Sequence, residues 1–327
     1  MDFVEVKNVS KKFGNFTAVN NISFNVKKGE IFGILGPNGA GKTTTLNMML
    51  GLLKPTSGSI SINGLDITKH GKELKQQIGL MTQETVVEAD LTARQNLELF
   101  AKLYHLNSEQ TKKRVSEALK ESQLTEFADK KAGTFSGGMQ RRLLLVKTLI
   151  HEPKLLILDE PTTGLDIQNR TGMWNHIKNL HKMGITIILT TQYLEEADAL
   201  CDRIAIIDYG KIIAMGTSSE IKRIVGENIL EVIAEEKQVN KVVDIIKEIS
   251  GVNPEVKVDK ITANIRKEPL ATIRKIADRL EKEKINVLAI SMHLPTLDDV
   301  FIKLTGNTMR DEVGSMKNPR GNIRFGR

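Results

Sequence analysis

The chain has 327 residues, 40% of them hydrophobic and 27% charged, which is enough for two folded domains with separate cores. Its single cysteine excludes a disulfide framework and fits a reducing cytoplasm; we find no signal peptide and no apolar run of ~20 residues, and expect no membrane span. The net charge of +7 raises nucleic acid or an anionic membrane surface as a partner, but most basic residues are interspersed with acids and indicate solvated helix faces.

Residues 1–35 alternate apolar and polar side chains between glycine turns, which predicts strands. The last strand, residues 30–35, leads into a complete phosphate-binding loop of the pattern G-x-x-x-x-G-K-[ST], and residues 44–50 predict a helix that leaves it. Because the loop lies between a strand and a helix, we predict that it binds a nucleoside triphosphate. The fixed positions of the pattern are Gly36, Gly41, Lys42 and Thr43.

In such a loop, backbone N–H groups and the start of the following helix face the phosphates. We expect Lys42 to neutralise the outer phosphates and Thr43 to offer its hydroxyl to Mg²⁺. The residues expected to line the nucleotide here are Gly36, Pro37, Asn38, Gly39, Ala40, Gly41, Lys42, Thr43 and Thr44.

Further along, strand patterns surround a long helical region. Apolar residues recur at helical spacing from about 92 to 150, which predicts a helical subdomain over about residues 86–150. Strands and helices alternate around it and predict an α/β domain of residues 1–220 with a mainly parallel sheet covered on both faces. The expected strands are residues 58–64, 77–82, 154–158, 186–190 and 203–208.

Two acids, Asp159 and Glu160, follow the apolar strand 155–158. A strand this apolar is buried on both faces and delivers its acids to the carboxyl edge of the sheet, where ligands bind in open α/β folds. We expect Asp159 to hold Mg²⁺ through water, and Glu160 to polarise the water that attacks the γ-phosphate. Two acids at a strand end are common by themselves; the phosphate loop makes them a candidate site.

A second anion-binding helix start is predicted at Ser136. This serine can cap a helix whose first backbone N–H groups belong to Gly137 and Gly138. Taken alone, the stretch predicts only a serine-capped helix without a ligand. One nucleotide in one subunit does not need two anion sites, whereas a nucleotide held between two copies of the chain does.

Residues 226–306 form a different unit, in which strand and helix patterns follow in the order βαββαβ and a further helix near 297–304 ends the unit. This order predicts a small C-terminal α+β domain of the ferredoxin-like type. Residues 307–327 are basic, rich in Gly and Asn and poor in large hydrophobic side chains, which predicts a disordered tail.

Together, the phosphate loop, the pair of acids and the Ser136 motif closely resemble the ATP-binding subunits of ABC transporters, over residues 1 to about 216. The resemblance implies a P-loop NTPase core of the ABC ATPase type with ATP and Mg²⁺ as cofactors. It implies that Ser136, Gly137 and Gly138 contact the γ-phosphate held by the opposite subunit.

Three further residues take their roles from the resemblance. Phe13 lies where family members place an aromatic that stacks on adenine, with packing in the core as the alternative. Gln83 matches a glutamine that touches Mg²⁺ and senses the membrane partner. Asp166, in Gly-Leu-Asp, matches a loop that lies across the dimer interface.

Gln192 stands where most ABC ATPases have a histidine. Its amide can donate a hydrogen bond to the γ-phosphate but cannot carry a titrating proton; the alternative is a polar strand end without a ligand. Residues 135–139 read Phe-Ser-Gly-Gly-Met in place of the usual Leu-Ser-Gly-Gly-Gln, and residues 294–301 read Leu-Pro-Thr-Leu-Asp-Asp-Val-Phe. These features resemble the daunorubicin/doxorubicin-resistance type of drug-exporter ATPase, in which a glutamine at this position is usual.

The resemblance implies a homodimer in the cytoplasm, held at the inner face of the cell membrane by a separately encoded integral-membrane permease. ATP binding is expected to close the dimer and hydrolysis to reopen it, with export of a drug or other hydrophobic substrate. The chief alternative is a soluble ABC ATPase that acts on nucleic acid or ribosomes, supported only by the basic tail; we expect no specific nucleic acid partner.

Two weaker alternatives conflict with the motifs. A degenerate cassette that only binds ATP is at odds with the presence of Lys42, Asp159 and Glu160. A GTPase is at odds with the lack of an Asn-Lys-x-Asp motif for guanine.

Overall fold

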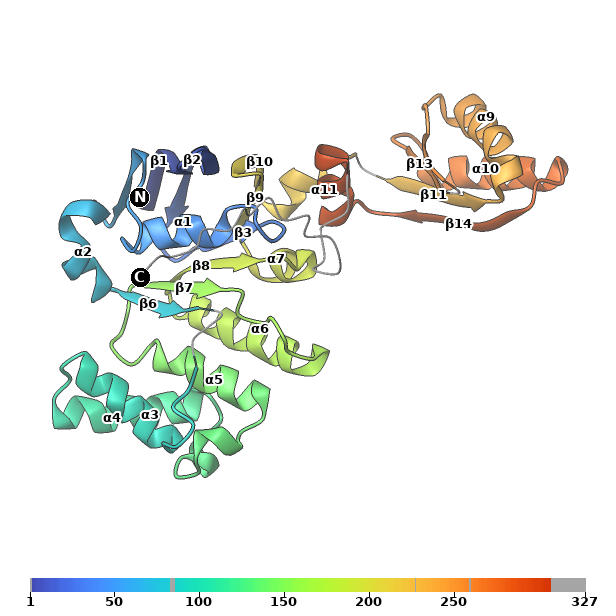
Figure 1. The fold of residues 1–327 in the computed structure, drawn as a ribbon. Helices are drawn as coiled ribbons and strands as arrows, with labels where there is room; N and C mark the ends of the chain where they lie inside the picture. The colour runs from blue at the N-terminus through green and yellow to red at the C-terminus, as the bar shows by residue number, and fades with distance from the viewer. Residues whose placement is uncertain (1, 83–85, 227, 259, 307–327) are drawn as a thin grey trace, which may run out of the picture.

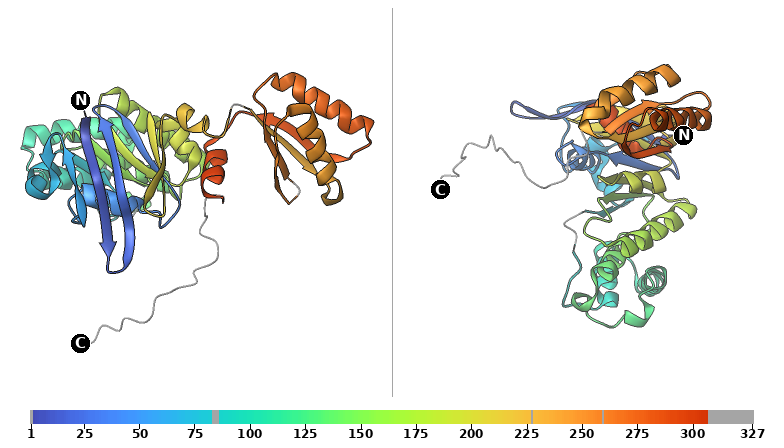
Figure 2. Two further views of the ribbon diagram at one scale, coloured as in Figure 1. Left: turned by 90° about the horizontal axis from the view of Figure 1, so that it is seen from above. Right: turned by 90° about the vertical axis from the view of Figure 1, so that its right-hand side faces the viewer.

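The computed structural model describes residues 2–82, 86–226, 228–258 and 260–306. In these residues the strands form three sheets (Figure 1). Two of the sheets and most of the helices build the part of the molecule that contains the phosphate loop, and the third sheet lies beyond it (Figures 1 and 2). No described helix is both long enough and apolar enough to span a membrane.

The central sheet has six strands in the order β10-β9-β3-β8-β7-β6, all parallel except β10. The residues of β3 and β7 are buried throughout because helices or a second sheet cover both faces. This confirms the predicted, mainly parallel α/β sheet. The strands are β3 (Ile31–Leu35), β6 (Ile78–Met81), β7 (Leu155–Asp159), β8 (Thr186–Thr191), β9 (Arg203–Asp208) and β10 (Lys211–Gly216).

One face of the central sheet packs against α1 (Lys42–Met49) and an antiparallel sheet of order β2-β1-β4-β5. The apolar side chains of that sheet alternate toward a shared core, in which Phe24 stacks on Phe32 at 5.1 Å between ring centroids. The helix α2 (Ile67–Lys75) follows β5. The strands are β1 (Asp2–Phe13), β2 (Phe16–Lys27), β4 (Ser57–Ile62) and β5 (Leu65–Asp66).

The other face of the central sheet packs against α5 (Gly137–Lys147) and α6 (Ile167–Lys182) (Figure 1). The predicted helical region is confirmed: α3 (Ala93–Leu103) and α4 (Ser108–Glu121) begin at capping boxes on Thr92 and Asn107. Two 3-10 turns, Thr125–Phe127 and Ala132–Thr134, then lead into α5.

The third sheet has the order β12-β13-β11-β14 with every neighbour antiparallel. Two helices cover one of its faces, so the predicted ferredoxin-like βαββαβ unit is confirmed (Figures 1 and 2). Its elements are β11 (Ile229–Ala234), the 3-10 turn Glu236–Gln238, α9 (Val239–Ser250), β12 (Glu255–Lys257), β13 (Lys260–Asn264), α10 (Pro269–Lys282) and β14 (Val287–His293).

The last helix, α11 (Leu297–Thr305), packs on the nucleotide-binding part and lies between the two parts (Figures 1 and 2). Its buried side chains, Leu297, Val300 and Phe301, share a cluster with Leu35 of β3 and with α7 (Leu194–Leu200) and α8 (Ser218–Lys222). The chain therefore leaves the nucleotide-binding part after α8 and returns to it with α11. The division at residues 1–220 and 226–306 remains a prediction.

Candidate nucleotide-binding site

The phosphate loop joins β3 to α1 at the carboxyl edge of the central sheet. Two of its glycines are required by the backbone: a Cβ at Gly36 would lie 2.2 Å from the carbonyl oxygen of Ile207, and Gly41 has a φ of 106°. The carbonyl of Ala18 would be 2.7 Å from a Cβ at Gly41. The other expected loop residues are Pro37, Asn38, Gly39, Ala40 and Thr44.

Lys42 is buried, with 4% of its surface exposed, and its ammonium lies inside the loop. The Nζ donates to the carbonyl oxygens of Gly36 at 2.7 Å and Pro37 at 3.2 Å. It also forms an ion pair with Glu160 Oε1 at 3.2 Å. The loop is thus folded around this cation, and a phosphate that enters it meets a positive charge already in place.

Asp159 and Thr43 meet at the same edge of the sheet. The hydroxyl of Thr43 donates to Asp159 Oδ2 at 3.3 Å, and the hydroxyl of Thr190 donates to Asp159 Oδ1 at 2.5 Å. A carboxylate and a hydroxyl are the hard oxygen ligands that suit Mg²⁺. Asp159 and Thr43 therefore fit a magnesium site next to the phosphate loop.

Glu160 turns sharply away from the end of β7, with a φ of 50°. Its backbone N–H donates to the carbonyl and the hydroxyl oxygen of Thr190, both at 3.1 Å. The hydroxyl of Thr163 donates to Glu160 Oε2 at 3.2 Å. These contacts hold a buried carboxylate beside Lys42, where a general base for water is expected.

Gln192 follows the end of β8, which lies between β3 and β7. The carbonyl of its neighbour Thr191 accepts a hydrogen bond from the N–H of Gly36 at 3.2 Å, so residue 192 is held beside the phosphate loop. The side chain of Gln192 is half-buried and makes no hydrogen bond within the described residues. An amide at this position can donate a hydrogen bond to a ligand held by the phosphate loop.

Ser136 caps α5, where its hydroxyl accepts from the N–H of Met139 at 3.3 Å. Ser136 and Gly137 are exposed, whereas Gly138 is buried against Asn169, whose Oδ1 would lie 2.0 Å from a Cβ. The helix lies on the opposite face of the central sheet from α1 (Figure 1). Within one chain, no described contact joins this helix start to the phosphate loop.

Asp166 caps α6, with Oδ1 accepting from the N–H of Asn169 at 2.8 Å and Oδ2 from its side-chain amide at 2.7 Å. These hydrogen bonds lower the pKa of Asp166, the one from the backbone most strongly. Asn169 therefore joins the Gly-Leu-Asp loop to Gly138 of the Ser136 motif.

Phe13 ends β1 and is 49% exposed, so its ring lies outside the core, with Lys11 Nζ 5.1 Å from its centroid. An exposed ring is available for stacking on a base. Gln83 lies outside the described residues.

Three residues that sequence reasoning did not single out organise this site. Thr190 orients both acids, as described above. Arg141, on α5, donates from Nε to the carbonyl oxygen of Pro161 at 2.7 Å and from NH2 to that of Glu160 at 2.8 Å. Glu196, on α7, is completely buried. Only the position of Thr190 at the end of an apolar strand gave a signal in the sequence.

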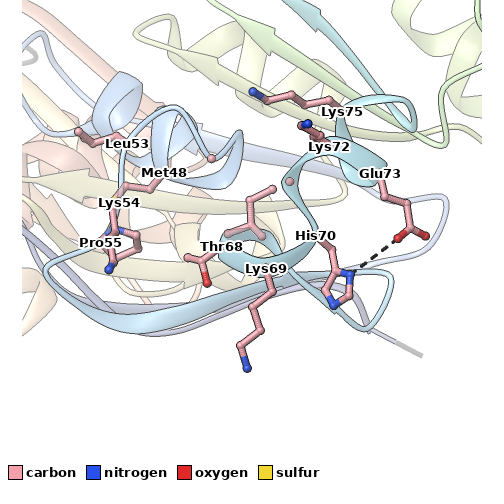
Figure 3. A pocket seen from close by; sticks show the side chains of 13 residues that line it. Met48, Leu53, Lys54, Pro55, Thr68, Lys69, His70, Lys72, Glu73 and Lys75 are labelled. Atoms are coloured by element: carbon pink, nitrogen blue, oxygen red, sulfur yellow. Dashed lines mark ion pairs between the residues drawn. The ribbon is translucent and has the colours of Figure 1, made fainter.

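A hollow of about 640 Å³ lies elsewhere, at the C-terminal end of α1. Figure 3 shows it between α2 and the segment after α1, with His70 and Glu73 paired at 3.8 Å. Phosphate-loop residues do not line it, so the hollow is not the nucleotide site. Its lysines are Lys54, Lys69, Lys72 and Lys75.

Two known sequence families match the chain. Residues 19–163 match the ABC transporter family, and residues 216–305 match the family described as ATP-binding protein DrrA1-3-like, C-terminal domain.

Relatives match along nearly the whole chain. The linearmycin resistance ATP-binding protein LnrL of Bacillus subtilis (strain 168) is 40% identical over 316 residues, which cover 94% of this chain and 100% of the relative. The daunorubicin resistance ATP-binding protein DrrA2 of Streptomyces coeruleorubidus is 38% identical, with 93% and 95% covered. A solved ATP-binding cassette, a dimer bound to ADP and Pi after hydrolysis, superposes with a TM-score of 0.59 at 30% identity, over 65% of this chain and 98% of that one.

The phosphate loop, the buried pair of acids and the serine-capped helix define an ATP-binding cassette. The chain belongs to the family of ABC transporter ATP-binding proteins, with a DrrA-like C-terminal domain. It binds nucleotide and is an ATPase.

Proposed function

We propose that the chain is the ATP-hydrolysing subunit that powers a membrane exporter, and that two copies close around ATP. The observation that carries this proposal is the exposed start of α5 at Ser136 and Gly137, on the opposite face of the sheet from α1. An anion site that its own phosphate loop cannot reach becomes useful when a second copy brings in a nucleotide.

In the closed dimer, each nucleotide lies between the phosphate loop of one chain and the Ser136 motif of the other. Lys42 binds the β- and γ-phosphates, and Thr43 and Asp159 hold Mg²⁺, which neutralises charge on the phosphate oxygens. Phe13 stacks on adenine, Gln192 donates to the γ-phosphate, and Gln83 adds a magnesium contact. The expected phosphate contacts from the backbone come from residues 36–44.

Glu160 acts as the general base toward the attacking water. In the present geometry its Oε1 is paired with Lys42 at 3.2 Å, so the two groups neutralise each other. When phosphates bind, Lys42 gains anionic partners that are stronger than a carboxylate. This frees Glu160 to orient water, and it links hydrolysis to a filled phosphate loop.

We propose a separately encoded integral-membrane permease as the partner, which holds the chain at the cytoplasmic face of the membrane. Two apolar side chains on α3, Leu99 and Leu103, are 37% and 61% exposed and lie one turn apart, and Leu52 after α1 is 60% exposed. Exposed apolar groups of this kind suit a protein partner. Resistance to linearmycin and daunorubicin in the relatives' names favours a drug or another hydrophobic compound as cargo.

The permease can be identified by copurification. A tagged Glu160→Gln chain, expressed in its native cell and extracted in mild detergent with Mg²⁺ and ATP, should bring down one integral-membrane protein in a stoichiometric amount. The matched control carries Ser136→Arg in addition to Glu160→Gln, so that the two chains cannot close around ATP. A membrane protein recovered only without Ser136→Arg depends on the ATP-bound dimer. Recovery of ribosomal RNA without a membrane protein would overturn the proposal in favour of a soluble ABC ATPase.

A further inference from the structure

Glu196 is a carboxylate buried without an ion pair in the described residues. It lies on α7, four residues after Gln192, and none of its surface is exposed. Its Oε1 accepts hydrogen bonds from the hydroxyl of Thr162 at 2.8 Å and from the indole N–H of Trp174 at 2.9 Å. Burying a carboxylate costs free energy unless strong hydrogen bonds compensate for the lost water. A buried carboxylate at this place therefore suggests a specific role.

Thr191, next to Gln192, also hydrogen-bonds the Glu196 carboxylate, and the two donors to Oε1 come from segments that carry other site residues. Thr162 lies two residues after Glu160, in the segment that links this acid to Gly164 and Asp166. Trp174 lies on α6, which Asp166 caps. A single oxygen atom therefore joins the helix that follows Gln192 to the segment that follows Glu160 and to the helix behind Asp166.

Two arginines interact electrostatically with Glu196. Burial lowers the pKa of Arg141, and the negative charge of Glu196 opposes that shift. Burial raises the pKa of Glu196, and the positive charge of Arg170, on α6, opposes that shift. The guanidinium of Arg170 lies 4.3 Å from the centroid of the Tyr193 ring. Arg141 donates hydrogen bonds to the carbonyl oxygens of Glu160 and Pro161. The negative charge of Glu196 favours the charged Arg141, and so favours these hydrogen bonds between α5 and the segment after β7.

We propose that Glu196 is a positioning residue for ATP hydrolysis: through Thr162 and Trp174 it fixes Gln192 and Glu160 relative to each other. It contacts neither the phosphate loop nor the reacting atoms. The inference rests on the roles proposed above for Gln192 and Glu160. An error of about 1 Å in the placement of catalytic groups lowers rates by up to about a hundredfold, so such a brace acts on kcat.

Thr162 offers a sharp test because its donor can be removed or kept at nearly constant volume. Thr162→Val deletes the hydroxyl and should lower kcat about five- to tenfold with KM for ATP within about twofold. Thr162→Ser keeps the donor and should restore most of the lost kcat. If Thr162→Val and Thr162→Ser have equal kcat and differ only in thermal stability, Glu196 is a purely structural group and the inference fails.

A second measurement tests whether the brace acts through Gln192. The Thr162→Val change should cost much less in kcat on a Gln192→Ala background than in the parent chain, since misplacing a missing amide has no effect. Full additivity would contradict the inference. Trp174→Phe, which removes the indole donor to Oε1, repeats the test if the Thr162 variants fold poorly. ATP-driven dimerisation, which tests the proposed function, should survive in all of these variants.

Discussion

Lys42 and Glu160 form an ion pair of 3.2 Å in which both side chains are nearly inaccessible, at 4% and 9% exposure. The two residues come from the phosphate loop after β3 and from the end of β7, so their contact joins two strand ends that β8 separates in the sheet. A buried charge that loses its only cation is left uncompensated. Removing one partner should therefore destabilise the nucleotide-free chain, and the pair keeps the proposed general base, Glu160, occupied until phosphates bind.

Lys42→Met should lower the free energy of unfolding of the nucleotide-free chain by about 3 kcal/mol, because it leaves Glu160 buried without a cation. The double variant with Glu160→Gln should recover much of this loss, since the neutral amide needs no counter-charge. Chemical denaturation at neutral pH without nucleotide measures both. Equal unfolding free energies for the single and the double variant would mean that the pair does not stabilise the free chain.

Gln192 should add no pH dependence to kcat near pH 6.5, because an amide carries no ionisable proton. Gln192→His should introduce such a dependence: kcat should change as the pH passes about 6.5, where an ordinary histidine titrates. Gln192→Ala should reduce kcat about tenfold or more by removing a donor to the γ-phosphate. Parental rates in Gln192→Ala would show that the proposed phosphate contact is dispensable.

Phe301 should matter to the nucleotide-binding part although it lies near the end of the described chain. It is 2% exposed and packs in the cluster that contains Leu35, next to the phosphate loop. Phe301→Ala should lower the unfolding free energy of that part by about 3 kcal/mol. Leu304→Ala, on the same helix but 38% exposed, is the control and should cost far less. The unfolding transition of the nucleotide-binding part can be recognised because bound nucleotide shifts it. If Phe301→Ala leaves this transition unchanged, the packing of α11 on that part is contradicted.

The sequence predicts the parts of the fold that short-range patterns determine. The phosphate loop needs residues close together in the chain, the apolar run 155–158 followed by two acids favours a buried strand, and Ser136 before two glycines signals a cap. The ferredoxin-like unit is also predictable, because its strands and helices follow one another without long insertions. The helical region before Ser136 is predictable as well, because its apolar residues recur at helical spacing.

Contacts between distant segments were not predictable. No local sequence pattern predicts the ion pair of Lys42 with Glu160 or the hydrogen bond from Arg141 to the carbonyl of Glu160. The same is true of the hydrogen bond that Glu196 accepts from Thr162. Each contact depends on how β3, β7, α5 and α7 are placed by the sheet. The helix α11 is a similar case: its apolar face predicts burial, but not burial against the nucleotide-binding part.

ATP-dependent dimerisation is the most direct test of the composite site. The Glu160→Gln chain, purified and passed over a sizing column with light-scattering detection, should be monomeric without nucleotide and dimeric with Mg²⁺ and ATP. Adding Ser136→Arg should keep it monomeric while ATP still binds, because the new side chain blocks the start of α5 and leaves the phosphate loop intact. A Glu160→Gln chain that binds ATP and remains a monomer would contradict the account.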